Sequence, residues 1–207
     1  MTEQHERRFS PRVALALTRR EGAEGPGTLA GHAAVFNQRA EIYPGFFEEI
    51  APGAFAESIR ADDIFGLWQH RSDQVLGRLR AKSLRLAEDD VGLATEIDLP
   101  ATALGADVAQ LVGRGDVTGM SFGFNVLDQE WITLPDGADL RIVKRVKLWE
   151  VSPVTFPAYD GTDLALRARD LWRAARDKDA AAPLGRPAPK APDFTILRAR
   201  LRLAGAL

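Results

Sequence analysis

Three side chains in this sequence, Ser121, His70 and Glu150, are of the types that together carry out acyl transfer. Ser121 lies in the run GMSFGF. If this run is a strand, alternation puts its methionine and both phenylalanines on one face and Ser121 on the other, between Gly119 and Gly123. Because glycine has no side chain, an extended peptide could approach the backbone closely on each side of the Ser121 hydroxyl, as a nucleophile requires. We therefore expect Gly119 and Gly123 to contact a bound substrate.

His70 and Glu150 have the surroundings of a general base and of the group that orients it. His70 closes an apolar segment, and a histidine at a strand end can act as a base because it titrates near neutrality. Glu150 continues the apolar side of a strand that carries Val146 and Leu148. A carboxylate on a core face needs a polar partner, because burying it unpaired costs several kcal/mol. An imidazole N–H would be such a partner, which suggests a Ser-His-Glu arrangement.

Simpler interpretations of these residues stay open at the level of sequence. The alternative for Ser121 is a solvent-facing serine on a glycine-rich strand, and the alternative for His70 is a histidine bonded to a neighbouring carbonyl. The alternative for Glu150 is an ion pair with an arginine such as Arg145 or Arg78. His32 competes for the role of base, although its alternation with small and apolar residues is typical of a packed strand. The remaining histidine, His5, lies in a polar N-terminal segment that we expect to be disordered.

Composition excludes several other classes of protein. The 207 residues include no cysteine, which rules out disulfide scaffolds, thiolate metal sites and a cysteine nucleophile. The three histidines lack metal-ligand spacing, so we expect neither metal nor cofactor. No apolar run reaches the roughly 18 residues of a membrane helix, and the N-terminus shows no secretory signal. The formal net charge of −2 argues against a protein built to coat nucleic acid.

Hydropathy alternation predicts a mainly-β domain of the α+β class. Expected strands cover residues 13–18, 29–36, 64–70, 75–79, 84–86, 91–99, 118–127 and 141–151. Helices are expected after Pro52-Gly53, over residues 104–112 and from residue 162 onward. We therefore predict an antiparallel sheet that closes wholly or partly into a barrel, with a few packed helices.

The predicted domain covers residues 11–178, between a flexible N-terminus at 1–10 and a tail. Residues 179–193 are expected to form a Pro/Ala-rich linker. The thirteen residues 180–192 include four prolines, which prevent regular structure. Residues 194–207 have the spacing of a basic amphipathic helix, which could dock on a partner or be a dispensable tail. Residues 170–207 contain eight basic and four acidic residues, whereas residues 1–169 contain 19 basic and 25 acidic residues. The tail is therefore net positive and the domain net negative.

Five stretches of the chain together resemble the prohead maturation proteases of tailed phages, which are related in fold to the herpesvirus capsid assembly proteases. The stretches run in family order and are residues 31–37 (GHAAVFN), 50–55 (IAPGAF), 67–71 followed by 75–78 (VLGR), 115–124 (GDVTGMSFGF) and 148–159 (LWEVSPVTFPAY). The resemblance covers roughly residues 29–167 and implies a barrel of the herpesvirus-protease type.

The resemblance implies that His70 and Ser121 are the catalytic histidine and serine. The herpesvirus relatives use a second histidine as the third member, but no histidine follows His70 here, so Glu150 is the candidate. Backbone N–H groups of the loop at 153–159 would form the oxyanion hole. The implied activity is that of a serine endopeptidase acting inside the immature procapsid, in the host cytoplasm. It would cut the scaffolding segment of the major capsid protein, or a separate scaffold protein, and itself.

The implied partners are therefore the major capsid protein, a scaffold protein and, by analogy with the herpesvirus relatives, a second copy of the chain. Neither a membrane nor a specific nucleic acid is expected as a partner. The alternative is a catalytically inactive assembly or scaffold-like factor that has the same fold. The three candidate residues argue against this alternative, although their presence alone does not establish turnover.

Overall fold

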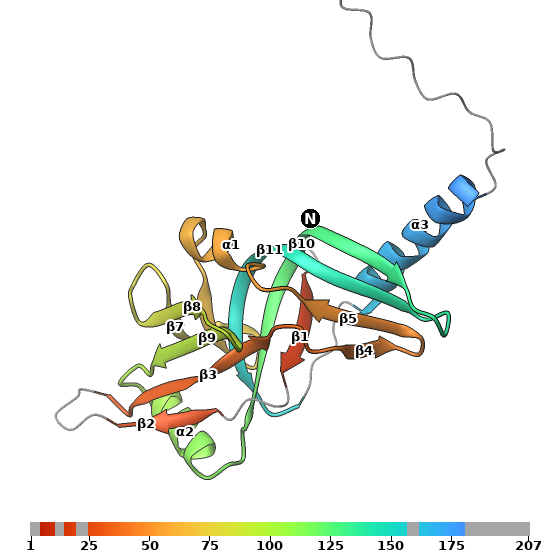
Figure 1. Ribbon diagram of the computed structural model, residues 1–207. Coiled ribbons are helices and arrows are strands. Elements are labelled where there is room, and N and C mark those ends of the chain that lie inside the picture. The colour runs from red at the N-terminus through yellow and green to blue at the C-terminus, as the bar shows by residue number, and fades with distance from the viewer. Residues whose placement is uncertain (1–4, 11–14, 20–24, 157–161, 181–207) are drawn as a thin grey trace, which may run out of the picture. The chain divides into compact units, whose positions relative to one another are not determined.

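A computed structural model describes residues 5–10, 15–19, 25–156 and 162–180 of the chain (Figure 1). Two β-sheets and three helices make up this part. The seven-stranded sheet contains β1 (Glu6–Ser10), β4 (Ala40–Tyr43), β5 (Phe46–Ile50), β6 (Phe65–Trp68), β7 (Arg71–Arg78), β10 (Gly119–Thr133) and β11 (Asp139–Val154). The four-stranded sheet contains β2 (Ala16–Thr18), β3 (Thr28–Val35), β8 (Leu84–Glu88) and β9 (Gly92–Asp98). The helices are α1 (Ala56–Ala61), α2 (Ala103–Gly113) and α3 (Thr162–Ala180).

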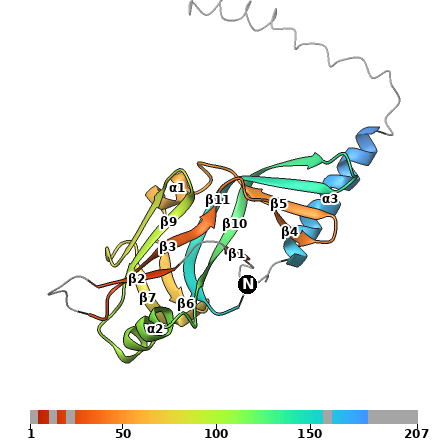
Figure 2. The same ribbon diagram turned by 60° about the horizontal axis from the view of Figure 1, so that its bottom comes forward.

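The two longest strands, β10 and β11, form a hairpin at the centre of the seven-stranded sheet (Figures 1 and 2). Its turn contains Leu134 and Gly137, and the Gly137 N–H donates to the Leu134 carbonyl at 2.9 Å. Gly137 has a φ of +83°, a conformation that glycine adopts without steric cost. On the other edges, β1 pairs with β10, whereas β5 and β6 both pair in parallel with β11. The hairpin therefore joins three strands that are distant in the sequence, β1, β5 and β6, into one sheet.

One continuous cluster of buried apolar side chains joins the two sheets and α2. From β10 it takes Met120, Phe122 and Phe124, which the sequence placed on one face of the strand. The four-stranded sheet contributes residues such as Leu93 and Ile97, and both are completely buried. Because this face of β10 lies in the core, the opposite face, with Ser121, is free to carry a site.

An extra residue in β11, Trp149, changes which face of the strand its side chains occupy. Gly123 pairs with Glu150, but the next residue, Phe124, pairs with Leu148. Such a β-bulge shifts the alternation of the strand by one residue. Leu148 is thereby kept in the core while Glu150 points to the opposite face, that of Ser121. The sequence prediction that Leu148 and Glu150 share one face is therefore wrong, because alternation does not reveal a bulge.

Helix α1 and the residues before it fill a gap along the edge of β11. The gap lies between the residues that pair with β5 and those that pair with β6. There the Val146 N–H donates to the Ala54 carbonyl at 3.0 Å, and the Leu148 N–H donates to Ser58 Oγ at 2.8 Å. These bonds satisfy backbone groups that would otherwise be buried without partners beside the bulge.

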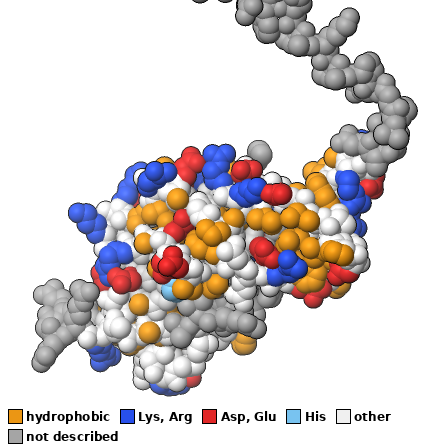
Figure 3. Space-filling view, in the orientation of Figure 1, with side chains coloured by type: hydrophobic (Ala, Val, Ile, Leu, Met, Phe, Trp, Pro, Cys, Tyr) orange, Lys and Arg blue, Asp and Glu red, His pale blue; other side chains and the backbone are white. Residues whose placement is uncertain are grey.

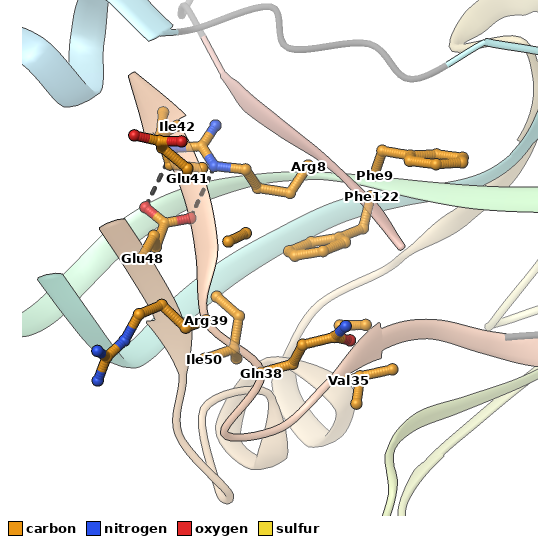
Figure 4. Close-up of a pocket in the computed structure, with 12 residues that line it drawn as sticks. Arg8, Phe9, Val35, Gln38, Arg39, Glu41, Ile42, Glu48, Ile50 and Phe122 are labelled. Carbon is orange, nitrogen blue, oxygen red and sulfur yellow. Dashed lines mark hydrogen bonds and ion pairs between the residues drawn. The ribbon is translucent and has the colours of Figure 1, made fainter. Parts of the chain in front are cut away.

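Four buried charged side chains fix β1 to the sheet: Glu6 and Arg8 from β1, Glu48 from β5 and Arg141 from β11. Arg8 Nε donates to Glu48 Oε1 at 2.7 Å, and Arg141 Nε donates to Glu48 Oε2 at 2.7 Å. Arg141 Nη2 also donates to Glu6 Oε2 at 2.6 Å. Figure 4 shows Arg8 extending from β1 to the Glu48 carboxylate beside a cavity of about 240 Å³. The two positive and two negative charges balance, as burial requires.

The mainly-β α+β class predicted from the sequence is confirmed. Within the described ranges the strand order closes neither sheet on itself, so the expected barrel is not confirmed. Three strands of the described residues, β1, β4 and β5, lie where no strand was expected. No helix of the described residues is long and apolar enough to cross a membrane.

The domain limits differ from those expected. Residues 6–10 form β1, so the expectation of a flexible segment at 1–10 is wrong for these residues. The chain divides into two compact units, Met1–Asp170 and Leu171–Leu207, and this division falls within α3 rather than near residue 178. The predicted linker and tail helix lie outside the described residues from 181 onward.

Glu48→Gln should unfold more easily than the wild-type protein, because Arg8 and Arg141 would lose their shared buried carboxylate. We expect urea titration at pH 7 to show a loss of about 3–5 kcal/mol in the free energy of unfolding. Burial alone raises the pKa of Glu48, but Arg8 and Arg141 outweigh it and hold that pKa below its ordinary 4.5. Stability from such a carboxylate is present above its unfolded pKa and lost as pH falls through the folded value. The difference between variant and wild type should therefore shrink below pH 4.5.

The matched control is Glu49→Gln, one residue along the same strand. Glu49 pairs with Arg39, whose side chain is 45% exposed. An exposed ion pair contributes at most about 1 kcal/mol. Equal stability of the two variants would contradict a structural role for the buried charges.

Candidate active site

Strand register brings Ser121 and Glu150 to one face of the seven-stranded sheet. Ser121 on β10 pairs with Ser152 on β11, and Gly123 pairs with Glu150. Paired residues of antiparallel strands project to the same side, so these four residues share a face. β6 lies alongside, with Phe65 opposite Glu150.

His70 reaches this face from the two-residue turn between β6 and β7. Trp68 pairs with Arg71, which leaves Gln69 and His70 as the turn residues. Both have positive φ, +54° and +60°, which is the arrangement of a type I′ turn. The turn directs the His70 ring back toward Glu150, although β6 itself ends further along β11.

A chain of hydrogen bonds links His70 to Glu150 and Glu150 to Ser152. His70 Nδ1 lies 2.6 Å from Glu150 Oε1, and Ser152 Oγ donates to Glu150 Oε2 at 2.5 Å. The His70 and Glu150 side chains are only 7% and 10% exposed. Because a carboxylate can only accept this bond, Nδ1 is its donor, and in the neutral imidazole Nε2 then has the free lone pair that a base needs. Sequence analysis did not identify Ser152, because nothing in the sequence marks a serine as a partner of Glu150.

The arginines that could have paired with Glu150 bind other carboxylates. Arg145 Nη1 donates to Glu57 at 3.1 Å, and Arg78 Nε donates to Asp63 at 2.8 Å. Glu150 therefore pairs with a histidine, as the Ser-His-Glu hypothesis requires of its carboxylate.

Two polar atoms of the site are buried with no hydrogen-bond partner in the described part of the chain: His70 Nε2 and Ser121 Oγ. Ser121 has no exposed surface. Buried polar atoms are normally bonded, so unpaired ones call for an explanation. The two atoms do not bond to each other either, so the hydrogen bond from nucleophile to base that acyl transfer uses is not formed in this structure.

The two glycines that flank Ser121 leave room for the protein's own side chains. A Cβ atom on Gly123 would lie 2.6 Å from Glu150 Oε1, and one on Gly119 would lie 2.2 Å from the Phe9 ring. Any larger residue at either position would displace one of these groups. Contact of Gly119 and Gly123 with a substrate stays a prediction.

A cavity of about 580 Å³ opens beside the site. His70, Glu150 and Gly123 line one side of it, and His5 and Arg7 from the N-terminal segment line another. The rest of its wall is largely apolar and consists of Phe65, Leu67, Val75 and Trp149, with the polar Ser72. A cavity with these walls could hold a side chain of an extended peptide.

The other two histidines lie in different surroundings. His32 is on the four-stranded sheet, where Nε2 lies 2.8 Å from Asp89 Oδ2. The hydrogen bond from the Gly92 backbone N–H is the largest cause that lowers the pKa of Asp89 to about 2, and the bond with His32 is the second. His5 stacks on Trp149 with ring centroids 4.7 Å apart, and Nδ1 lies 3.0 Å from Asn125 Oδ1. The expectation that His5 is disordered is therefore wrong.

Two further expectations concern the oxyanion hole and metal ions. The loop at 153–159 is described only as far as Phe156, and Pro153 has no N–H to donate. Its role in the oxyanion hole stays a prediction. Among the described residues no group of His, Asp or Glu side chains has the arrangement of a metal site.

Comparison with known proteins gives three findings. The prohead protease of Enterobacteria phage HK97 is 32% identical over 159 residues, which are 73% of this chain and 65% of that protein. This chain thus spans less than two thirds of the length of that relative. The solved structure of the bacteriophage T4 capsid assembly protease matches 71% of this chain and 98% of its own, with 10% identity and a TM-score of 0.41. Residues 14–176 match the model of the caudovirus prohead serine proteases. Because that match covers most of the chain, including His70, Ser121 and Glu150, this chain belongs to the caudovirus prohead serine protease family.

Proposed function

We propose that this chain is a serine endopeptidase of capsid maturation, with Ser121 as nucleophile, His70 as general base and Glu150 as the group that orients His70. The observation that carries the proposal is the hydrogen-bonded pair of His70 and Glu150 on the face of Ser121. His70 Nε2 and Ser121 Oγ both lie in this buried site, and neither has a hydrogen-bond partner among the described residues.

The reaction proceeds in two steps. Ser121 Oγ attacks the scissile carbonyl carbon while His70 Nε2 accepts its proton, and Glu150 stabilises the resulting imidazolium. The C–N bond then breaks as His70 passes this proton to the leaving amine. Water, deprotonated by His70, hydrolyses the acyl ester and returns Ser121 to its hydroxyl form. Ser152 supports the second oxygen of Glu150 throughout.

The proposed substrates are the scaffolding segment of the major capsid protein or a separate scaffold protein, and the chain itself, inside the procapsid. Family membership supports this choice. The cavity beside His70, which Gly123 also lines, is compatible with an extended peptide. On the face seen in Figure 3, positive and negative side chains are interspersed, which gives no support to a nucleic-acid partner.

Co-expression with the major capsid protein of the same particle tests the proposal. Wild type should shorten the capsid protein and Ser121→Ala should not, because alanine has no hydroxyl to attack the peptide bond. Intact mass spectrometry of both proteins gives the products and the cleaved bond. Equal cleavage by both variants would show that Ser121 is not the nucleophile. If neither protein cuts the capsid protein or a co-expressed scaffold protein, the inactive assembly factor becomes the better account.

Glu150→Gln should keep the fold and lose most of the activity. A neutral amide can no longer stabilise the imidazolium or fix the proton on Nδ1, and equivalent changes cost on the order of 10⁴-fold in turnover. Cleavage rates of purified variants on a peptide that spans the cut site measure the effect. The control is Glu96→Gln, because the Glu96 side chain is 51% exposed and pairs with Arg85 at the surface. Similar rates for the two variants would remove Glu150 from the mechanism.

Phe9→Ala should make Ser121 more accessible to small reagents. Phe9 pairs with Ser121 across β1 and β10, and its ring lies against Gly119. The Arg8 and Glu48 ion pair should keep β1 in place after the substitution. We expect a fluorophosphonate to modify Ser121 faster in this variant than in wild type, and Phe47→Ala, on β5, to have no effect. A rate equal to that of wild type, or no modification of either protein, would show that Phe9 does not shield the serine.

A further inference from the structure

We propose that Gln69 is a positioning residue that fixes His70 in reach of Glu150, an inference that rests on the proposed function. Gln69 and His70 form the turn between β6 and β7, both with positive φ. Such turns favour Asn and Gly, because longer side chains are strained in this conformation. Two long side chains at these positions are therefore an unfavourable choice for the turn itself. His70 bonds to Glu150, and the contacts of Gln69 indicate what its side chain does.

Gln69 makes three hydrogen bonds to the end of β11. Its backbone N–H donates to the Pro153 carbonyl at 3.2 Å. Its side-chain Nε2 donates to Thr155 Oγ1 at 2.5 Å, and the Thr155 N–H donates back to Gln69 Oε1 at 3.3 Å. The amide thus uses both its donor and its acceptor on one residue. Such a two-point contact fixes orientation as well as distance.

The position of this contact explains its effect on the site. β11 carries Glu150 and Ser152 and is followed directly by Thr155, so the strand that holds the carboxylate leads into the residue that holds the turn with the histidine. The pairing of β6 with β11 is short, with register only at Glu150 and Val151. Beyond these two pairs, the hydrogen bonds of Gln69 and the bond of His70 to Glu150 hold the turn against β11 and the residues that follow it. Losing the bonds of Gln69 should let the turn move away from β11 and weaken the bond between His70 Nδ1 and Glu150.

Gln69→Gly separates a positioning role from a role in folding. Glycine adopts positive φ readily, so the turn should form at least as well as in wild type. The variant keeps the backbone N–H and lacks only the amide that bonds to Thr155. The His70 Nδ1 proton should give a downfield signal in the proton NMR spectrum of wild type, and we expect this signal to be lost or broadened by exchange in the variant. In peptide cleavage, kcat should fall by up to about 100-fold, with KM unchanged.

Two further variants complete the test. Thr155→Val, which loses the hydroxyl partner, should weaken the His70 signal in the same direction, and the double variant should be no worse than Gln69→Gly alone. Lys82→Gly is the matched control, because Lys82 is an exposed turn residue with a φ of +60° that does not contact the site. It should change neither the signal nor kcat.

The NMR comparison decides the proposal independently of cleavage. A His70 signal in Gln69→Gly as sharp as that of wild type would overturn it, and so would the absence of the signal from wild type. A wild-type protein that shows the signal and the expected loss but cleaves nothing would support the positioning role of Gln69. It would then count against the proposed function alone.

Discussion

The bulge at Trp149 in β11 is the feature on which the arrangement of the site depends. Before the bulge, Leu148 packs into the core, and after it Val151 does the same. Without the extra residue, Glu150 would point into the core beside Leu148, where its charge would lack a partner. The bulge keeps the residues on both sides of it, Leu148 and Val151, in the apolar core and still sends one carboxylate to the opposite side. β-Bulges are often found beside active sites for this reason.

Other parts of the fold hold the bulged strand and its partners in place. Helix α1 supplies Ser58 Oγ to the Leu148 N–H, so the edge of β11 stays bonded where no strand covers it. Gly123 leaves room for the Glu150 carboxylate. The buried ion pairs of β1 fix its register on β10, which determines that Phe9 rather than a charged residue lies beside Ser121. A buried ion-pair network adds little net stability compared with apolar packing, but a shifted register of β1 would leave its charges buried without their partners.

Local patterns predicted the residues of the site better than they predicted its geometry. The GMSFGF run identified the apolar and polar faces of β10, and the turn at Gly137 follows from its sequence. The pairing of Glu150 with a histidine was one of two open interpretations, and the structure places it on His70. The bulge, the parallel pairing of β5 and β6 with β11, and strand β1 depend on contacts between residues far apart in the sequence. Glu6 and Arg8 give β1 a charged pattern, so hydropathy could not identify it as a buried strand.

The central claim is that Ser121 forms a covalent acyl intermediate with His70 as its base. Acid quenching of a reaction with an activated ester, followed by peptide mapping with mass spectrometry, would locate the acyl group. This account predicts an acyl group on Ser121 in wild type, and little or none in His70→Ala, where no base removes the proton. Ser152 lies directly across the hairpin and is the internal comparison, because it is equally buried but bonded to Glu150. An acyl group on Ser152, or peptide cleavage with no covalent intermediate, would contradict the account.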